Sequence, residues 1–240
     1  MPRPAKTSRT AAPPAPFTGF ADGDARFFSE LAAHQSREWF AANRAEYEEG
    51  WLAPMQALLG AVRARLAPRY AHEEIAEPKV FRIHRDVRFS KDKSPYKTHI
   101  GGYLGIVGSD AGPAGTAALY FHVGADELFA CAGQYVMNGE QLQRFRAAVG
   151  DAERGDELAG IVAALARAGF TLGSHEEMRR VPRGFDPEHR RADLLRRKGL
   201  VAIFPAPARA LLTSPQLVDV LATQAAQAAP LVAWLAAVTL

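Results

Sequence analysis

The sequence has one cysteine among its 240 residues, Cys131, which excludes a disulfide framework and fits a reducing compartment. Cys131 lies in the mostly apolar run 128–132, and this setting favours a buried, inert thiol over a nucleophile. No apolar run reaches the ~18–20 residues that a membrane-spanning helix needs, and no apolar stretch follows the basic N-terminus as a secretory signal requires. We therefore expect a cytoplasmic protein without a membrane partner.

The sequence also lacks the motifs of common nucleotide and cofactor enzymes. It has no phosphate-binding P-loop, no dinucleotide fingerprint and no nucleophile elbow. Glycines 101, 102 and 105 fall inside a predicted strand, where close backbone packing or a bulge is the usual reason for glycine. The motifs therefore predict no cofactor and leave the reaction, if there is one, undefined.

Composition and proline placement divide the chain into a tail and one domain. Hydrophobic residues make up 48% and charged residues 23%, which is typical of a globular protein. Residues 1–16 contain five prolines and three basic residues, so we expect a disordered tail there. Residues 17–240 contain no clear linker and no internal repeat, so we expect a single domain.

The spacing of apolar residues changes along the chain from a helical period to an alternating one. Helices are predicted around residues 26–31, 37–49 and 54–66, and again at 139–149, 156–168, 187–198 and beyond 214, where Pro230 is expected to kink or split the last one. Strands are predicted at 79–89, 97–107, 116–124, 127–136 and 200–204. Short links between the first four favour an antiparallel meander. The predicted fold class is α+β, with an antiparallel sheet of about four or five strands packed with N-terminal and C-terminal helices.

Positive charge is concentrated in two short blocks. Residues 79–99 contain seven Lys or Arg against two acids, and residues 179–198 contain eight against three, so each block carries +5. Since the formal net charge is only +3, the rest of the chain carries −7. This asymmetry is more informative than the total, because two basic blocks in an acidic body indicate anion-binding surfaces.

Alternation within the predicted strands separates apolar from polar side chains. Successive side chains of a strand point to opposite faces, so residues two apart share a face. If the first three predicted strands are neighbours, one face gathers the polar residues Arg82, His84, Asp86, Arg88, Lys97, His99, Tyr103, Tyr120 and His122. Phe81 and Phe89 are then expected on the opposite, apolar face.

Cations placed this close repel one another, so a bound anion is an attractive way to offset them. Arginine's planar fork suits phosphate or carboxylate, and the turn 90–96 adds lysines and hydroxyls. The predicted partner is a small phosphorylated or carboxylated ligand, and the predicted anion-binding residues are Arg82, Arg85, Arg88, Lys91, Lys93, Tyr96 and Lys97. A second basic patch is predicted at Arg179, Arg180 and Arg183.

The run from Phe81 to His99 resembles the signature of a widespread bacterial and fungal family of conserved hypothetical proteins. Residues 37–44, 128–135, 182–185 and 196–198 fit the same family, and the resemblance extends from Phe17 to about Val232. At positions 34–35 this chain has His-Gln where Asn-Asn is more usual. The resemblance implies a domain of unknown function and a complete single member, and it supplies no catalytic residue.

Four functional readings stay open. In the first, the anion site also catalyses, with His84 or His99 as general acid or base and Asp86 orienting the imidazole. In the second, the basic blocks bind nucleic acid, although the expected placement of the two phenylalanines leaves only tyrosines for stacking on bases. A metal site built from His84, Asp86, His99 and His122 is the third, and it is disfavoured by the lack of tight ligand spacing and by the neighbouring cations. The fourth is a protein-interaction module on the helices 37–51 or 187–198.

Overall fold

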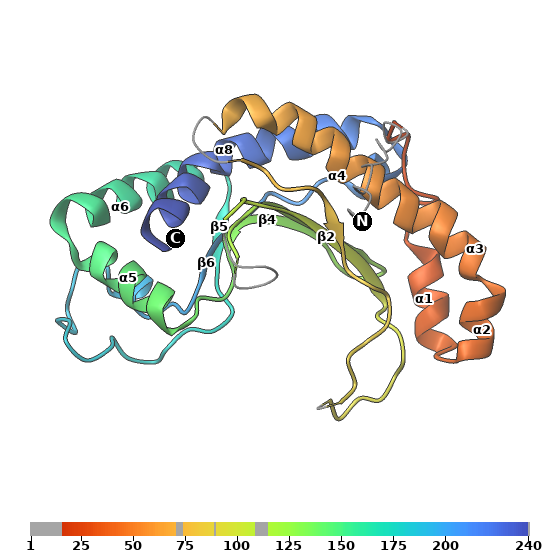
Figure 1. Cartoon of the computed structure of the whole chain (residues 1–240), viewed down its shortest axis with the longest axis horizontal. Helices are drawn as coiled ribbons and strands as arrows, with labels where there is room; N and C mark the ends of the chain where they lie inside the picture. Colours follow the sequence, from red (N-terminus) through yellow and green to blue (C-terminus); the bar gives the residue numbers. More distant parts are fainter. Residues whose placement is uncertain (1–15, 71–73, 89, 109–114, 240) are drawn as a thin grey trace, which may run out of the picture.

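The computed structural model describes residues 16–70, 74–88, 90–108 and 115–239. The expected N-terminal tail therefore lies outside the described residues, apart from Pro16. The described chain folds as α+β, as predicted, with helices before, after and beside one antiparallel sheet (Figure 1). The helices are α1 (Arg26–Ala33), α2 (Arg37–Ala42), α3 (Arg44–Tyr47), α4 (Ala53–Leu66), α5 (Gly139–Gly150), α6 (Ala152–Arg167), α7 (Ala192–Leu195) and α8 (Gln216–Thr239).

The sheet has six strands rather than the four or five predicted. They are β1 (Lys79–Val80), β2 (His99–Gly105), β3 (Ala117–Gly124), β4 (Leu128–Gln134), β5 (Thr171–Gly173) and β6 (Leu200–Ile203). Their order is β1-β2-β3-β4-β6-β5, and every neighbouring pair is antiparallel. The predicted meander is confirmed in β2, β3 and β4. The strand predicted at 200–204 is β6, which pairs with β4, and the added strand is β5, which pairs with β6.

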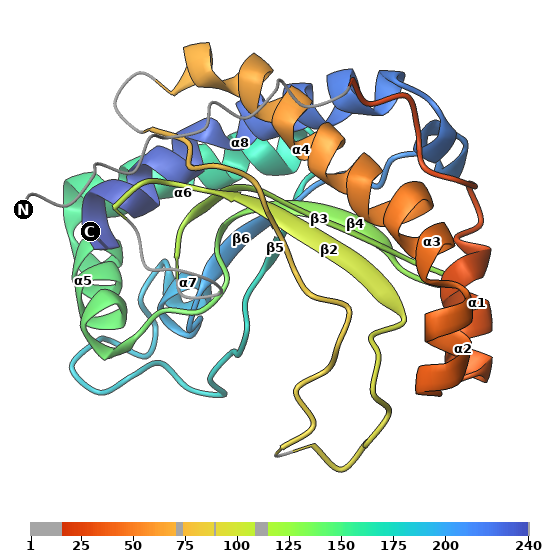
Figure 2. The same cartoon turned by 45° about the vertical axis from the view of Figure 1, so that its right-hand side comes forward.

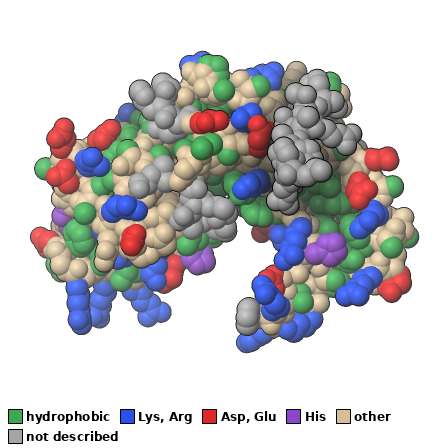
Figure 3. Space-filling view, in the orientation of Figure 1, with side chains coloured by type: hydrophobic (Ala, Val, Ile, Leu, Met, Phe, Trp, Pro, Cys, Tyr) green, Lys and Arg blue, Asp and Glu red, His purple; other side chains and the backbone are tan. Residues whose placement is uncertain are grey.

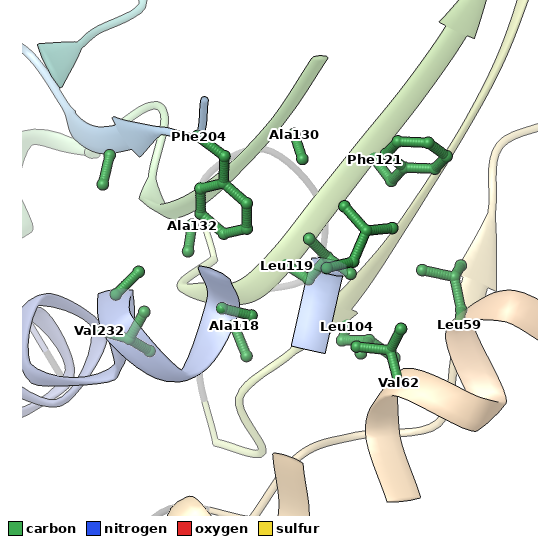
Figure 4. Close-up of a cluster of buried hydrophobic side chains, with 14 of the residues drawn as sticks. Leu59, Val62, Leu104, Ala118, Leu119, Phe121, Ala130, Ala132, Phe204 and Val232 are labelled. Carbon is green, nitrogen blue, oxygen red and sulfur yellow. The ribbon is translucent and has the colours of Figure 1, made fainter. Parts of the chain in front are cut away.

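Helices α4 and α8 lie together across one face of the sheet, which we call the helix face (Figures 1 and 2). Side chains from β2, β3 and β4 meet apolar side chains of both helices there, and Figure 4 shows part of this cluster: Leu59, Val62, Leu104, Leu119, Phe121, Ala130, Ala132 and Val232. Gly102 permits the close approach, because a Cβ on it would lie 2.6 Å from a methyl group of Leu59. The largest part of the hydrophobic core therefore lies on this side of the sheet.

Helix α8 runs without interruption through Pro230, which corrects the predicted split. The helix has 24 residues and contains an 18-residue window with a mean hydropathy of 1.3, so by length and composition it could cross a membrane, and the sequence-based statement that no such run exists was wrong. Half of its apolar window is buried inside the protein, against the sheet and against α4, α5 and α6.

The N-terminal helical region has a break that its apolar spacing did not predict. One helix over 37–49 was expected, but α2 ends at Ala42 and α3 begins at Arg44. Between them, the side-chain amide of Asn43 donates to the carbonyl oxygen of Trp39 at 2.9 Å. A π-helical segment (Glu48–Leu52) then connects α3 to α4 and places the fully buried Trp51 under Phe20 and Phe28.

The predicted strand 79–89 is the main error in the sheet. Only Lys79 and Val80 pair as a strand, and the chain then leaves the sheet as a long hairpin arm, described at residues 81–88 and 90–97 (Figures 1 and 2). The predicted strand residue Phe89 lies outside the described residues. The arm is held at its base by an isolated bridge between His84 and Tyr96 and by backbone hydrogen bonds such as Lys97 N–H to Ile83 O at 2.8 Å. Pro95 has no N–H to donate, so a regular ladder cannot continue along this arm.

The predicted helix 187–198 is also shorter than expected. Only Ala192–Leu195 is helical, and turns precede it. The reason is Arg191, whose buried guanidinium donates to Val149 O at 2.7 Å and Asp151 O at 2.6 Å and pairs with Asp156. These contacts tie the segment to the junction of α5 and α6 instead of letting it coil as one helix.

Candidate functional site

Strand register places alternate residues of β2, β3 and β4 on the face of the sheet opposite α4 and α8. Tyr103 lies across from Tyr120, and His122 lies across from Phe129. We call this surface the aromatic face and define it by His99, Tyr103, Tyr120, His122 and Phe129. The predicted sharing of a face by the first four of these residues is confirmed.

A cavity of about 580 Å³ occupies the aromatic face. It is lined mostly by aromatic rings, small residues and two imidazoles, from the base of the hairpin arm to β6 and the end of β5. The lining residues are Phe81, His99, Tyr103, Gly115, Ala117, Tyr120, His122, Phe129, Cys131, Ala132, Gly133, Tyr135, Gly173, Ser174, Val201 and Ile203. Figure 3 shows the molecule hollowed below the sheet, with Lys and Arg gathered on both sides of the hollow.

Two histidines lie side by side in the floor of the cavity. The rings of His99 and His122 are 4.1 Å apart, and the ring of His122 stacks on Phe129 at 4.7 Å. The hydroxyl of Tyr120 lies 3.1 Å from Nδ1 of His122, in hydrogen-bond contact. Gly101 makes room for this arrangement, because a Cβ there would lie 2.9 Å from the Tyr120 hydroxyl.

Burial keeps both imidazoles neutral at physiological pH. Burial, together with the nearby positive charge of Lys97, lowers the pKa of His99, and burial with the neighbouring His99 lowers the pKa of His122 to about 4. A carboxylate oxygen of Glu127 lies 3.1 Å from Nε2 of His122, and that buried nitrogen makes no hydrogen bond among the described residues. Burial also raises the pKa of the Tyr120 hydroxyl, which stays protonated.

Cys131 completes the floor of the cavity. It is 8% exposed, and burial raises the pKa of its thiol to about 12. The prediction of a buried, unreactive thiol is confirmed, because a cysteine acts as a nucleophile through its thiolate.

The hairpin arm divides the predicted anion-binding residues into paired and unpaired cations. Arg85 pairs with Asp92 at 2.6 Å, and Arg88 pairs with Asp86 at 2.6 Å, which lowers the pKa of Asp86 to about 2. The ammonium of Lys93 donates to Val87 O at 2.8 Å. The arginines that seemed most suitable for an anion therefore already have carboxylate partners.

Arg82 and Lys97 are different, since neither has an ion-pair partner in the described part of the chain. Lys97 is half-buried, and its ammonium lies 5.3 Å from the centre of the Phe81 ring at the edge of the cavity. Burial and the charge of Arg82 lower the pKa of Lys97, so the two cations oppose each other. Lys91, at the tip of the arm, is exposed.

Three sequence-based placements need correction. Phe81 lines the aromatic cavity, stacked 5.4 Å from Tyr103, instead of lying on the apolar face. Tyr96 is 3% exposed and stacks on Phe40 at 4.4 Å, so the structure places this predicted anion ligand in the core. His84 packs near Phe40 and Tyr96, away from the cavity lining. The misplacement of Phe81 follows from the register of β1 with β2. Lys79 lies opposite Tyr103, so Lys79 and Phe81 are on the aromatic face.

The three candidate acid–base residues also lie in different places. Of His84, Asp86 and His99, only His99 lies in the cavity, and Asp86 is bonded to Arg88. The structure does not bring together the four residues considered for a metal site, and no group of three or more potential ligands that could hold a metal ion occurs among the described residues. His122, which the alternation placed on this face, lies in the cavity lining next to His99.

The second basic patch lies on the loop 174–191, at the opposite edge of the sheet from the hairpin arm (Figures 1 and 2). Arg179, Arg180 and Arg183 are exposed, without an ion-pair partner among the described residues. By contrast, Arg196 and Lys198 are paired with Asp193 and Glu176. The two basic blocks therefore do not merge into one cluster but flank the aromatic face.

Two useful residues were missed by sequence reasoning. The amide of Gln35 clamps the backbone of Tyr96, accepting from Tyr96 N–H at 3.1 Å and donating to Tyr96 O at 3.3 Å, and so fixes the hairpin arm to the α1–α2 link. Tyr135, which is 47% exposed, extends the row of rings toward the loop 174–191, where it meets His175. For Gln35, the one available sequence signal was the atypical His-Gln pair at positions 34–35.

Comparison with known proteins adds a family but no activity. A family profile described as "Conserved hypothetical protein (DUF2461)" matches residues 24–234. No curated protein matches the sequence, and no solved structure matches it.

Proposed function

The chain belongs to the DUF2461 family of conserved hypothetical proteins, and on that premise, which assigns no activity, we propose that the aromatic face binds a small ligand with a phosphoryl or carboxyl group on a flat or apolar body. One observation carries the proposal. A half-buried lysine, Lys97, lies at the edge of a cavity lined by rings, with the charge of Arg82 close enough to act on it, and neither side chain has an ion-pair partner among the described residues.

The energetic argument starts from the repulsion between these two cations. Partial burial weakens solvent screening, so the charge of Arg82 disfavours the ammonium form of Lys97. An anion bound between them would remove that cost and would gain charge-assisted hydrogen bonds from both side chains. Arg82 supplies a planar fork for a phosphate or carboxylate, and Lys97 supplies a point charge.

The cavity favours a ligand that also has a flat or apolar part. Its volume of about 580 Å³ lies within the range of ~300–1,000 Å³ typical of small-molecule sites. Phe81, Tyr103 and Phe129 offer ring surfaces, and the two neutral imidazoles place polar atoms among them. A bare inorganic anion would leave these rings without a partner.

Ligand binding is tested with a thermal-shift screen of nucleotides, sugar phosphates, aryl phosphates and dicarboxylates, followed by calorimetry on the best compound. A compound at a hundred times its Kd is expected to stabilise the protein by about 2.7 kcal/mol. Lys97→Met, which keeps the apolar stem, and Arg82→Ala are each expected to weaken binding about tenfold. Arg167→Ala removes an exposed arginine from the end of α6 and is the matched control, expected to bind like the wild type. An equal loss in the control, or no stabilising compound in the panel, would reject the proposal.

A second function, general acid–base catalysis on the bound ligand, is favoured by His122, whose ring lines the cavity with the Tyr120 hydroxyl 3.1 Å from Nδ1 and a Glu127 carboxylate oxygen 3.1 Å from Nε2. A neutral imidazole can accept a proton at the ring nitrogen that carries none, and the Tyr120 hydroxyl beside Nδ1 and the Glu127 carboxylate beside Nε2 fix the orientation of the ring. Once a ligand is identified, His122→Gln should retain binding and lose turnover. Turnover equal to that of the wild type would exclude this role.

A further inference from the structure

The two basic segments lie too far apart for one small anion. The hairpin arm follows β1, the loop 174–191 follows β5, and these are the first and last strands in the sheet order. Five spacings of about 4.8 Å between neighbouring strands put roughly 24 Å between the outer strands. A single phosphate or carboxylate can contact only one of the two segments, so the loop arginines have no role in binding a small ligand at Lys97.

The loop presents its arginines in a defined way. Met178 N–H donates to Arg196 O at 2.8 Å before the arginines, and Phe185 packs against Gly150 after them. Between these two fixed points, Arg179, Arg180 and Arg183 are exposed without an ion-pair partner among the described residues. The other cations of the block at 190, 191, 196, 197 and 198 all lie near carboxylates. Within this block, the basic side chains without an ion-pair partner among the described residues are therefore confined to the exposed part of the loop, which also contains the acids Asp186 and Glu188.

Aromatic rings occupy the space between the two sets of cations. Phe81 and Tyr103 lie next to the hairpin arm, Tyr120 and Phe129 lie in the middle, and the exposed Tyr135 lies next to the loop through its contact with His175. A positively charged path with rings along it is the chemistry that binds single-stranded nucleic acid, because phosphates follow the cations while unpaired bases stack on the rings. A duplex hides its base faces and cannot use these rings.

From this arrangement we infer that the aromatic face binds a short single strand of nucleic acid, which runs from the hairpin arm across the rings to Arg179, Arg180 and Arg183. This inference rests on the proposed function, since the cavity at Lys97 would take one nucleotide of the strand. The remainder of the chain carries −7, so attraction ends at the edges of this face and a short strand is favoured over a long one.

The length of the strand is the first test. Fluorescence anisotropy compares labelled oligothymidylates of 2, 4, 8 and 12 nucleotides with an 8-base-pair duplex, and calorimetry measures thymidine monophosphate. Affinity is expected to rise at least tenfold from 2 to 8 nucleotides and then to level off, with the duplex binding at least tenfold more weakly than the single strand of 8. Equal affinity for all lengths, or duplex binding as tight as single-strand binding, overturns the inference.

The loop is tested by the triple substitution Arg179→Ala, Arg180→Ala and Arg183→Ala. It is expected to weaken binding of the 8-mer at least tenfold and to reduce the slope of log K against log salt by about 2, because each phosphate contact on a single strand contributes about 0.7. Binding of the monophosphate should not change. The matched control replaces the exposed arginines Arg69, Arg154 and Arg167 with alanine and should bind the 8-mer like the wild type.

The two proposals fail in different ways. If the monophosphate binds through Arg82 and Lys97 but the triple variant binds every strand normally, the inference fails and the proposed function stands. If neither nucleotides nor the other anions bind, both fail. Tyr135→Ala adds a readout for stacking, because its ring is exposed and folding does not depend on it: the 8-mer should bind ~5- to 10-fold more weakly, and Tyr135→Phe should restore the affinity.

Discussion

The two faces of the sheet come from the same strands but have opposite surroundings. On the helix face, Ile100, Leu104 and Phe121 are at most 1% exposed and contact apolar helix side chains. On the aromatic face, Tyr103, Tyr120 and Phe129 are only partly buried, and a cavity lies over them. Since side chains alternate along a strand, neighbouring residues contribute to the core on one side and line the cavity on the other. Substitutions one residue apart should therefore have separable effects.

The largest expected difference is between two phenylalanines of adjacent strands. Phe121→Ala empties a fully buried site between the sheet and the helices and should lower the free energy of unfolding by about 3–5 kcal/mol. Phe129→Ala removes a ring that is partly exposed in the cavity, so the loss should be less than half as large. Urea denaturation of both variants measures this, and equal losses would break the comparison.

Acid should destabilise the protein through the aromatic face. The pKa of His122 is lowered to about 4 in the folded protein, so below pH 6.5 the unfolded chain binds a proton that the folded one does not. Stability contributed by this group is present above about pH 6.5 and is lost as the pH falls toward 4, by about 3 kcal/mol in total. His99, whose pKa is also lowered, adds to the same slope.

Denaturation of the wild type and of His122→Gln at pH 7 and pH 4.5 measures this contribution. Glutamine cannot take up a proton, so the variant should lose clearly less stability between the two pH values. A pH dependence identical to that of the wild type would show that His122 does not titrate differently in the folded protein.

Two adjacent glycines sharpen the comparison further. In Gly102→Ala the new methyl group meets Leu59 at 2.6 Å on the helix face, and the strain should cost about 1–3 kcal/mol of stability. In Gly101→Ala the methyl group meets the Tyr120 hydroxyl at 2.9 Å on the aromatic face, where the side chain can shift into the cavity. Thermal unfolding should show that Gly102→Ala is the less stable of the two variants. Ligand-binding measurements should show that Gly101→Ala has the lower affinity.

The smallest expected effect concerns the base of the hairpin arm. Gln35→Ala removes two hydrogen bonds to the backbone of Tyr96 and should cost about 1 kcal/mol. Amide hydrogen exchange should become faster in residues 83–97 and should stay unchanged in β3 and β4. Unchanged exchange in the arm would mean that the stacking of Tyr96 on Phe40 holds it without the clamp.

The alternation of polar and apolar residues correctly predicted those parts of the site that depend only on the position of a residue within its strand. It grouped His99 with Tyr103 and Tyr120 with His122, and the register of β2 with β3 then brought the two pairs together. It could not fix the register between 79–89 and 97–107, and a shift of one residue exchanges the faces. His84 was therefore assigned to the wrong side, and Phe81 with it.

Other features depend on contacts between distant residues and leave little local signal. Strand β5 has three residues and finds its place only by pairing with β6, which follows it by 27 residues. The conformation of the hairpin arm decides which of its charged residues form ion pairs, and a count of charges cannot predict it. The pairs are Arg85 with Asp92 and Arg88 with Asp86. Gln35 and Tyr96 are 61 residues apart, and nothing in the local sequence around either residue predicts their hydrogen bonds.

The outermost strands of the sheet are its shortest, two residues in β1 and three in β5. A long exposed outer strand is a template on which another chain can add, and this route leads to fibrils. Here each border offers few free backbone groups, and β1 also carries Lys79, whose charge resists the approach of a second basic border. The short outer strands thus protect the sheet from aggregation through its edges.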